Sequence, residues 1–217
     1  MASGIVIIDK PSGWTSMDVC AKIRGILKEK RVGHGGTLDP MATGVLPVFV
    51  GQATHAVEFA ENGEKEYIAG LRLGLVTNTQ DTSGETLETH PVTVDRAALK
   101  AVLPRFTGPI AQIPPMYSAI KINGQKLYDL ARKGKEVERK PRNITIFELE
   151  LLEQVSETDY LLRCRCSKGT YLRTLCHDIG QALGCGGTMF SLRRTMAAGY
   201  TPVSYTHLRA HETGRNL

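Results

Sequence analysis

Residues 33–47 read GHGGTLDPMATGVLP, and the rest of the chain is arranged around this stretch. Its four glycines permit positive φ angles and allow a ligand to approach the backbone closely. Pro40 fixes its own φ angle and biases Asp39 away from helical geometry. The apolar run VLPVFVG over residues 45–51 is typical of a strand. We therefore expect Asp39 to lie on a tight, well-defined loop beside a strand.

Asp39 is the one carboxylate of this stretch, with His34 and Thr37 as polar neighbours. A solitary carboxylate suits nucleophilic catalysis or electrostatic stabilisation better than paired acid–base hydrolysis. A structural alternative is a glycine-rich turn in which Asp39 only caps the local backbone. The spacing GxxxxGK[ST] is absent and no lysine follows the glycines, which argues against a Walker-type phosphate loop.

Composition indicates a soluble globular protein. The chain has 217 residues with 41% apolar and 23% charged residues, enough to bury a hydrophobic core. A net charge of +5 mildly favours an anionic partner.

Five cysteines without a CxxC pair predict reduced, mostly buried thiols and no zinc site. Since the N-terminus is not a signal peptide and no apolar run approaches about 18 residues, we expect a cytoplasmic protein without membrane contact.

Hydrophobic periodicity, together with capping residues and turn-forming glycines and prolines, predicts both helices and strands. The helix after the turn at residues 10–16 has Ser16 or Asp18 as a candidate cap, and the last long helix has Thr170. The expected strands cover residues 4–10, 45–51, 67–73, 143–155 and 159–167. The strands at residues 143–155 and 159–167 are expected to pair across a polar turn. The expected helices cover residues 17–30, 94–106, 125–134 and 171–183.

The stretch GHGGTLDPMATGVLPV resembles the catalytic motif of the TruB family of pseudouridine synthases, which modify the T-loop uridine of transfer RNA. The resemblance extends over residues 4–200 in several ordered motifs. These further motifs are KPSGWTSMDV at residues 10–19, the K-x-Y pair Lys65 and Tyr67, QIPPMYSAIKINGQKLYDLARKG at residues 112–134 and SKGTYLRTL at residues 167–175.

The resemblance implies an α+β pseudouridine synthase fold. Such a fold has a mixed, mostly antiparallel central sheet, flanking helices and a central RNA-binding cleft. Residues 1–200 would form the catalytic domain, and residues 201–217 would be a disordered tail or a non-native scar. The chain would then be of the bacterial type and lack the C-terminal PUA-like domain.

The resemblance also implies the catalytic residues. Asp39 would be the nucleophile, Tyr67 would stack on the uracil and Arg173 would pair with Asp39. An arginine in the first helical turn opposes the helix dipole and needs a compensating anion, for which Asp39 is the obvious candidate. Eight lysines and arginines between residues 121 and 142 suggest a surface that follows RNA phosphates. The expected RNA-contacting residues are His34, Lys10, Lys65, Tyr171, Leu192, Lys121 and Arg132.

Pseudouridine formation needs no redox change, metal or other cofactor. The implied partner is the T stem-loop of tRNA, modified at position 55 by a monomeric enzyme that flips the uridine out. Attack of Asp39 on ribose C1′ and removal of a C2′ proton both remain open. Three alternatives also remain: a non-catalytic RNA-binding or tRNA-folding protein, a relative that acts in guide-RNA complexes, and an unrelated hydrolase. The combination of Asp39, Tyr67 and Arg173 favours the synthase, because binding alone needs no such set.

Overall fold

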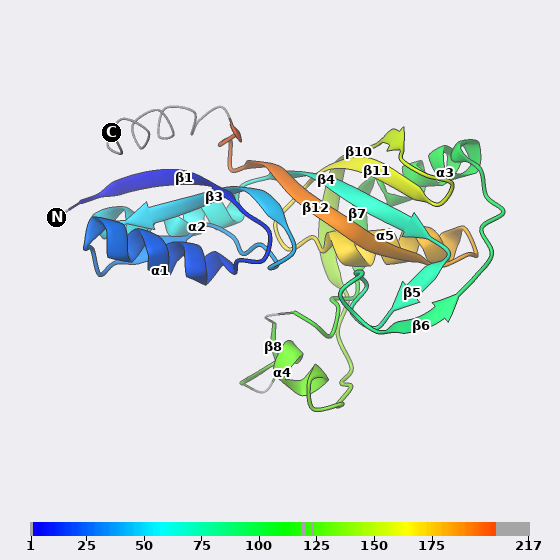
Figure 1. The fold of residues 1–217 in the computed structure, drawn as a ribbon, viewed down its shortest axis with the longest axis horizontal. Helices are drawn as coiled ribbons and strands as arrows, with labels where there is room; N and C mark the ends of the chain where they lie inside the picture. The colour runs from blue at the N-terminus through cyan, green and yellow to red at the C-terminus, as the bar shows by residue number, and fades with distance from the viewer. Residues whose placement is uncertain (1, 119, 123, 203–217) are drawn as a thin grey trace. The chain divides into compact units, whose positions relative to one another are not determined.

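The computed structural model describes residues 2–118, 120–122 and 124–202, and it divides into two compact units (Figure 1). Unit 1 consists of Met1–Ile68 and Ser191–Leu217, and unit 2 consists of Ala69–Phe190. Strands β4 (Lys65–Leu73) and β12 (Gly187–Ala197) each begin in one unit and end in the other. The predicted α+β class with a mixed, mainly antiparallel sheet is confirmed.

The sheet of unit 1 is built on β3 (Thr43–Val50), the strand predicted from VLPVFVG. β3 pairs antiparallel with β1 (Gly4–Lys10) and with β2 (Val32–His34), and parallel with β12. Helix α1 (Ser16–Leu27) packs against this sheet through a shared hydrophobic cluster, and Figure 1 shows it lying along β1 and β3. The 3-10 helix η1 (Gly51–Ala56) leads from β3 into helix α2 (Val57–Asn62).

The cap of α1 differs from the expectation. Thr15 is the N-cap: its hydroxyl accepts from the Asp18 N–H, and the Asp18 carboxylate accepts from the Thr15 N–H. This reciprocal capping box leaves the Ser16 hydroxyl available for a contact elsewhere.

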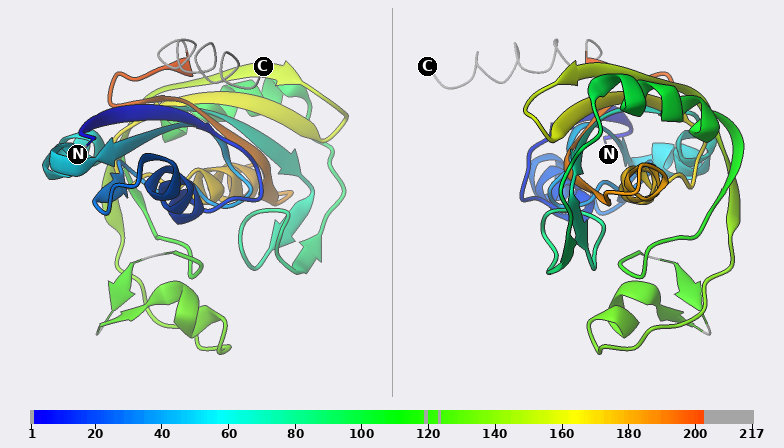
Figure 2. Two further views of the ribbon diagram at one scale, coloured as in Figure 1. Left: turned by 60° about the vertical axis from the view of Figure 1, so that its left-hand side comes forward. Right: turned by 90° about the vertical axis from the view of Figure 1, so that its right-hand side faces the viewer.

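Unit 2 contains the antiparallel strands β7 (Gly108–Gln112), β10 (Arg142–Gln154) and β11 (Asp159–Cys166). The predicted pairing of the two long strands is confirmed, and they run side by side in both views of Figure 2. Cys164 and Cys166 share the buried face of β11, as their spacing predicts.

The helices of unit 2 are α3 (Arg96–Val102), followed by the 3-10 turn η2 (Leu103–Phe106), and α5 (Leu172–Ala182). The expected cap of α5 at Thr170 is wrong. Tyr171 is the N-cap without a side-chain cap bond, and the Thr170 hydroxyl donates to the Ser167 carbonyl instead.

Two small hairpins complete unit 2. Strands β5 (Leu75–Thr77) and β6 (Thr86–Thr89) form one, and β8 (Lys121–Ile122) and β9 (Gln125–Lys126) form the other. The second hairpin leads into α4 (Leu127–Ala131), which has a small hydrophobic cluster of its own with Met116. The tail predicted at residues 201–217 falls almost wholly outside the described residues. No helix in the described ranges has the length and apolarity that crossing a membrane requires.

Candidate active site

The Asp39 loop, defined here as residues 35–42 between β2 and β3, is a tight structure as predicted. The Asp39 carbonyl accepts a hydrogen bond from the Ala42 N–H at 3.0 Å, which closes a turn at the carboxylate. Leu38 is buried and Pro40 is exposed, so the chain passes from the core to the surface at Asp39. The carboxylate is therefore carried at the edge of a folded loop, where a substrate can reach it.

The residues on both sides of Asp39 are anchored by the turn and helix start of residues 10–16. The Ser16 hydroxyl accepts from the Leu38 N–H at 2.9 Å and lies 3.3 Å from the Leu38 carbonyl. The Pro40 carbonyl accepts from the Gly13 N–H at 2.8 Å. Because neighbours on each side are fixed, the backbone at Asp39 has little freedom to move.

Lys10 also supports this loop. Its side chain has no exposed surface, and its ammonium donates to the carbonyls of Pro11, Trp14 and Pro40 at 2.9, 2.7 and 3.2 Å. Burial lowers the pKa of Lys10, and the nearby Asp39 carboxylate acts in the opposite direction. Lys10 therefore supports the Asp39 loop, and the RNA contact expected of it from the sequence stays a prediction.

Arg194 is a site residue that the sequence analysis missed. It is 1% exposed, and its guanidinium donates to the carbonyl of Gly36, which precedes Asp39, and to that of Val45, which follows it in β3. The available signal was a pair of arginines, Arg193 and Arg194, in the strand-like run MFSLRRT at residues 189–195.

Four other predicted residues lie in unit 1. His34 is partly buried in β2, and its Nδ1 has no hydrogen-bond partner within the described residues. Burial lowers the pKa of His34, and Arg194 lowers it further against the effect of Glu61. Lys65 and Tyr67 are buried in β4, and Leu192 is buried in β12.

Arg173 lies in the first turn of α5 in unit 2, as predicted, and is 6% exposed. Its guanidinium donates to the carbonyls of Thr79 and Tyr117 at 3.1 and 2.8 Å. Its Nη1 lies 3.6 Å from the Asp81 carboxylate, so Asp81 is one anion beside this helix start. The predicted pairing of Arg173 with Asp39 joins residues of different units and stays a prediction.

The loop around Asp81 is itself tied to α5. One Asp81 oxygen accepts from the Thr79 hydroxyl at 2.8 Å and from the Ser83 N–H at 3.0 Å. Gln80, at a φ of 62°, accepts from the Thr174 hydroxyl at 2.8 Å. These contacts show that the loop supports Arg173 and the first turn of α5.

The remaining predicted residues of unit 2 lie near its second hairpin and α5. The Tyr171 backbone is held by the Gln112 side chain at 3.0 and 3.2 Å. Lys121 lies in β8, and Arg132 follows α4. Arg132 lines a pocket of about 470 Å³ whose other lining residues are Gly124, Gln125, Lys126, Asp129 and Lys133.

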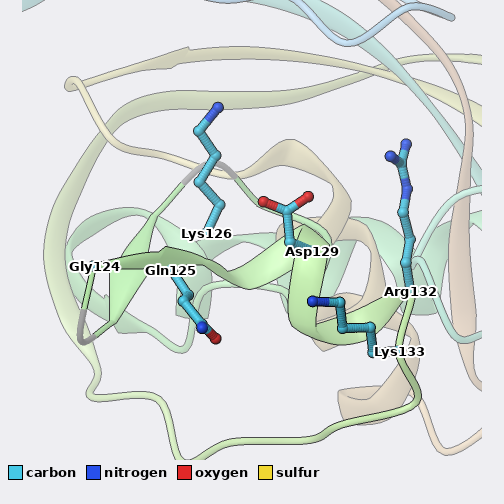
Figure 3. A pocket seen from close by; sticks show the side chains of 6 residues that line it. All are labelled: Gly124, Gln125, Lys126, Asp129, Arg132 and Lys133. Carbon is cyan, nitrogen blue, oxygen red and sulfur yellow. The ribbon is translucent and has the colours of Figure 1, made fainter.

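Figure 3 shows that the side chains of Lys126, Asp129 and Arg132 extend to the same side of this pocket. The Arg132 guanidinium lies 5.4 Å from the centre of the Tyr128 ring. Three cations and one carboxylate give the pocket an excess of positive charge, which suits an anionic group.

The five cysteines are free and buried, as predicted. Among the described residues, no group of three or more His, Cys, Asp or Glu side chains is placed to hold a metal ion.

Comparison with known proteins identifies the family. The model of the TruB family pseudouridylate synthase (N terminal domain) matches residues 24–172, and that of the tRNA pseudouridylate synthase B C-terminal domain matches residues 173–212. A tRNA pseudouridine synthase B of Pseudomonas putida is 50% identical over 218 aligned positions, which cover 99% of this chain and 71% of the relative. One of Clostridium kluyveri is 50% identical over 192 positions, covering 88% of this chain and 66% of the relative.

Solved structures with a similar fold support this family assignment. The crystal structure of a Cbf5-Nop10-Gar1 complex contains a chain that is 35% identical, with a TM-score of 0.73 over 92% of this chain. A structure of an H/ACA RNP bound to a substrate RNA containing 2′-deoxyuridine is 30% identical, with a TM-score of 0.69 over 97% of this chain. This chain spans 50% and 55% of those two chains. It belongs to the TruB family of pseudouridylate synthases.

Proposed function

We propose that this chain isomerises uridine 55 in the T loop of tRNA to pseudouridine, with Asp39 as the nucleophile. Family membership and the relatives named tRNA pseudouridine synthase B support the reaction and the kind of RNA. The observation that carries the role of Asp39 is its loop, in which Leu38 and Pro40 are both hydrogen-bonded to the turn and helix start of residues 10–16. A reacting carboxylate gains most from such prior positioning.

The reaction exchanges one bond of the uracil for another. The bond between N1 and ribose C1′ breaks, and a bond between C5 and C1′ forms; C5 loses a proton and N1 gains one. An ionised Asp39 either attacks C1′ or removes a C2′ proton. The Arg173 guanidinium would favour the carboxylate form if it lies within ion-pair reach of Asp39.

Recognition of the RNA divides into base and phosphate contacts. Tyr67 would stack on the flipped uracil, Leu192 would line its pocket and His34 would enter the T loop. Phosphates would lie on the basic surface that includes Lys121 and Arg132 and the pocket of unit 2. Lys65 and Tyr171 are the remaining residues that we expect to contact the RNA. We expect the enzyme to act as a monomer in the cytoplasm.

The test is conversion of an unmodified tRNA transcript, with pseudouridine scored by mass spectrometry. We expect conversion by the wild-type chain at position 55, none with Asp39→Asn, and unchanged conversion with Glu58→Gln, an exposed carboxylate of α2. A transcript with cytidine at position 55 should give no product. Full conversion by folded Asp39→Asn would disprove the role of Asp39. Binding of tRNA without conversion by the wild-type chain would favour the non-catalytic alternative.

A further inference from the structure

We propose that Arg194 is a positioning residue whose buried guanidinium holds Gly36 of the Asp39 loop close to Val45 of β3, and thereby sets the place of the Asp39 carboxylate during the reaction. The inference rests on the proposed function for its catalytic consequence. Arg194 lies in the part of β12 that belongs to unit 1, and its partners Gly36 and Val45 lie in the same unit.

The guanidinium makes a two-point contact. Its Nε donates to the Val45 carbonyl at 2.7 Å, and its Nη2 donates to the Gly36 carbonyl at 3.1 Å. Gly36 precedes Asp39 in the loop, and Val45 follows it in β3. Because the guanidinium is rigid and planar, these two bonds fix the separation of the two carbonyls. A lysine ammonium is a point donor and does not reproduce this geometry.

The backbone of Arg194 is equally fixed. Arg194 is in parallel register with Gly44, whose φ is 103°. A Cβ at Gly44 would lie 2.2 Å from the Arg194 carbonyl oxygen, so only glycine allows β3 to approach β12 this closely. The main chain at Arg194 is therefore held against β3, which fixes the position from which the side chain extends.

The buried charge of Arg194 requires polar partners, and the backbone around Asp39 supplies them. Burying a charge is unfavourable unless polar groups compensate for it, and here main-chain carbonyls of the loop and β3 do so. Burial lowers the pKa of Lys10 and of His34, and the Arg194 charge acts in the same direction on both. The guanidinium is thus close enough to influence residues on two sides of the Asp39 loop.

Arg193 provides a matched control. It is the preceding residue of β12, and its side chain is 41% exposed. Its guanidinium donates to both carboxylate oxygens of Asp9 at 3.1 Å, and it lies 3.5 Å from the Thr43 hydroxyl. Successive residues of a strand point to opposite faces, so the two arginines differ in environment but not in chemistry or strand.

The experiment compares Arg194→Lys with Arg193→Lys in four measurements: thermal unfolding, tRNA affinity, the single-turnover rate of pseudouridine formation and hydrogen–deuterium exchange. For Arg194→Lys we expect a rate about 100-fold lower with tRNA affinity within about threefold, because displacement of a reacting group by about 1 Å has an effect of this size. Exchange should rise in the peptide covering residues 35–42 and stay unchanged in β1. Arg193→Lys should match the wild type in all four.

Two results would overturn the proposal. One is a single-turnover rate for folded Arg194→Lys within about twofold of the wild type, far from the loss expected of misplacement. The other is a rise in exchange throughout unit 1 with activity lost in proportion to the unfolded fraction, which would show a general stabilising role. If Arg194→Lys does not fold, Arg194→Gln is measured in the same way, and failure of both to fold also counts against the proposal. If the wild-type chain forms no pseudouridine, the proposed function fails, while the exchange comparison still decides whether Arg194 holds the loop.

Discussion

Asp81 lies 3.6 Å from Arg173, and both side chains are more than nine-tenths buried. One Asp81 oxygen is occupied by Thr79 and Ser83, and the other faces the guanidinium. Asp81 therefore connects the loop after β5 to the first turn of α5. The attraction within this ion pair is stronger than within the exposed ion pairs of unit 2, because water screens buried charges much less.

We predict that Asp81→Asn lowers the free energy of unfolding by about 3 kcal/mol, since it removes the negative charge from a buried ion pair. The matched control is Glu136→Gln, which removes the carboxylate of the exposed pair with Arg139 and should change stability by less than about 1 kcal/mol. Urea unfolding measures both variants. Equal effects of the two substitutions would show that burial of the Asp81 pair has no energetic consequence.

Gly44→Ala should be much more destabilising than Gly169→Ala. Both glycines have a positive φ, of 103° and 80°, so both variants lose about 1–2 kcal/mol to backbone strain. An added Cβ at Gly44 would overlap the backbone of Arg194, whereas at Gly169 it meets nothing within 4 Å. We expect Gly44→Ala to lose about 2 kcal/mol more than Gly169→Ala in the same unfolding measurement. Equal free energies of unfolding for the two variants would mean that β3 can move away from β12 without loss of stability.

Stability should depend on pH through Asp178 in α5. Burial raises the pKa of Asp178 to about 6 from its ordinary value of 3.8. The native state then holds this proton more tightly than the unfolded state, so the contribution is fully present below pH 3.8 and is lost as pH rises through about 6.

Asp178→Asn removes this dependence. Between about pH 4 and pH 7 the variant should gain about 1–2 kcal/mol relative to the wild type, after a reduction for the partial exposure of the carboxyl. Urea unfolding at several pH values gives the difference, which would be constant with pH if Asp178 did not titrate in this range.

Arg132 is expected to contact phosphate in the proposed complex with tRNA. Arg132→Ala should weaken tRNA binding and reduce the slope of log affinity against log salt concentration by about 1, because one phosphate contact is lost. Lys100→Ala, on the exposed side of α3, is the control with an unchanged slope. Filter binding over a range of salt concentrations provides both values. An unchanged slope for Arg132→Ala would remove this residue from the RNA surface.

Local rules were sufficient for much of the fold. The glycines, Pro40 and the apolar run after them predicted a tight loop followed by β3, because turn geometry and strand formation depend on neighbouring residues. Two strand-like runs separated by a short polar turn likewise predicted the pairing of β10 with β11. The helix caps were less predictable: at α1, Thr15, Ser16 and Asp18 all have capping side chains, and packing of Ser16 against Leu38 selects Thr15.

The sequence by itself determined the family, the Asp39 loop and the strand that follows it, since motifs and backbone preferences are properties of consecutive residues. Only the tertiary structure decided which side chains hold that loop. Lys10 and Arg194 are long cationic side chains of a kind usually found at the surface. They are buried here because carbonyl oxygens from distant parts of the chain converge on each charge. That convergence has no local pattern in the sequence, because it arises only when β1, β3 and β12 come together in one sheet.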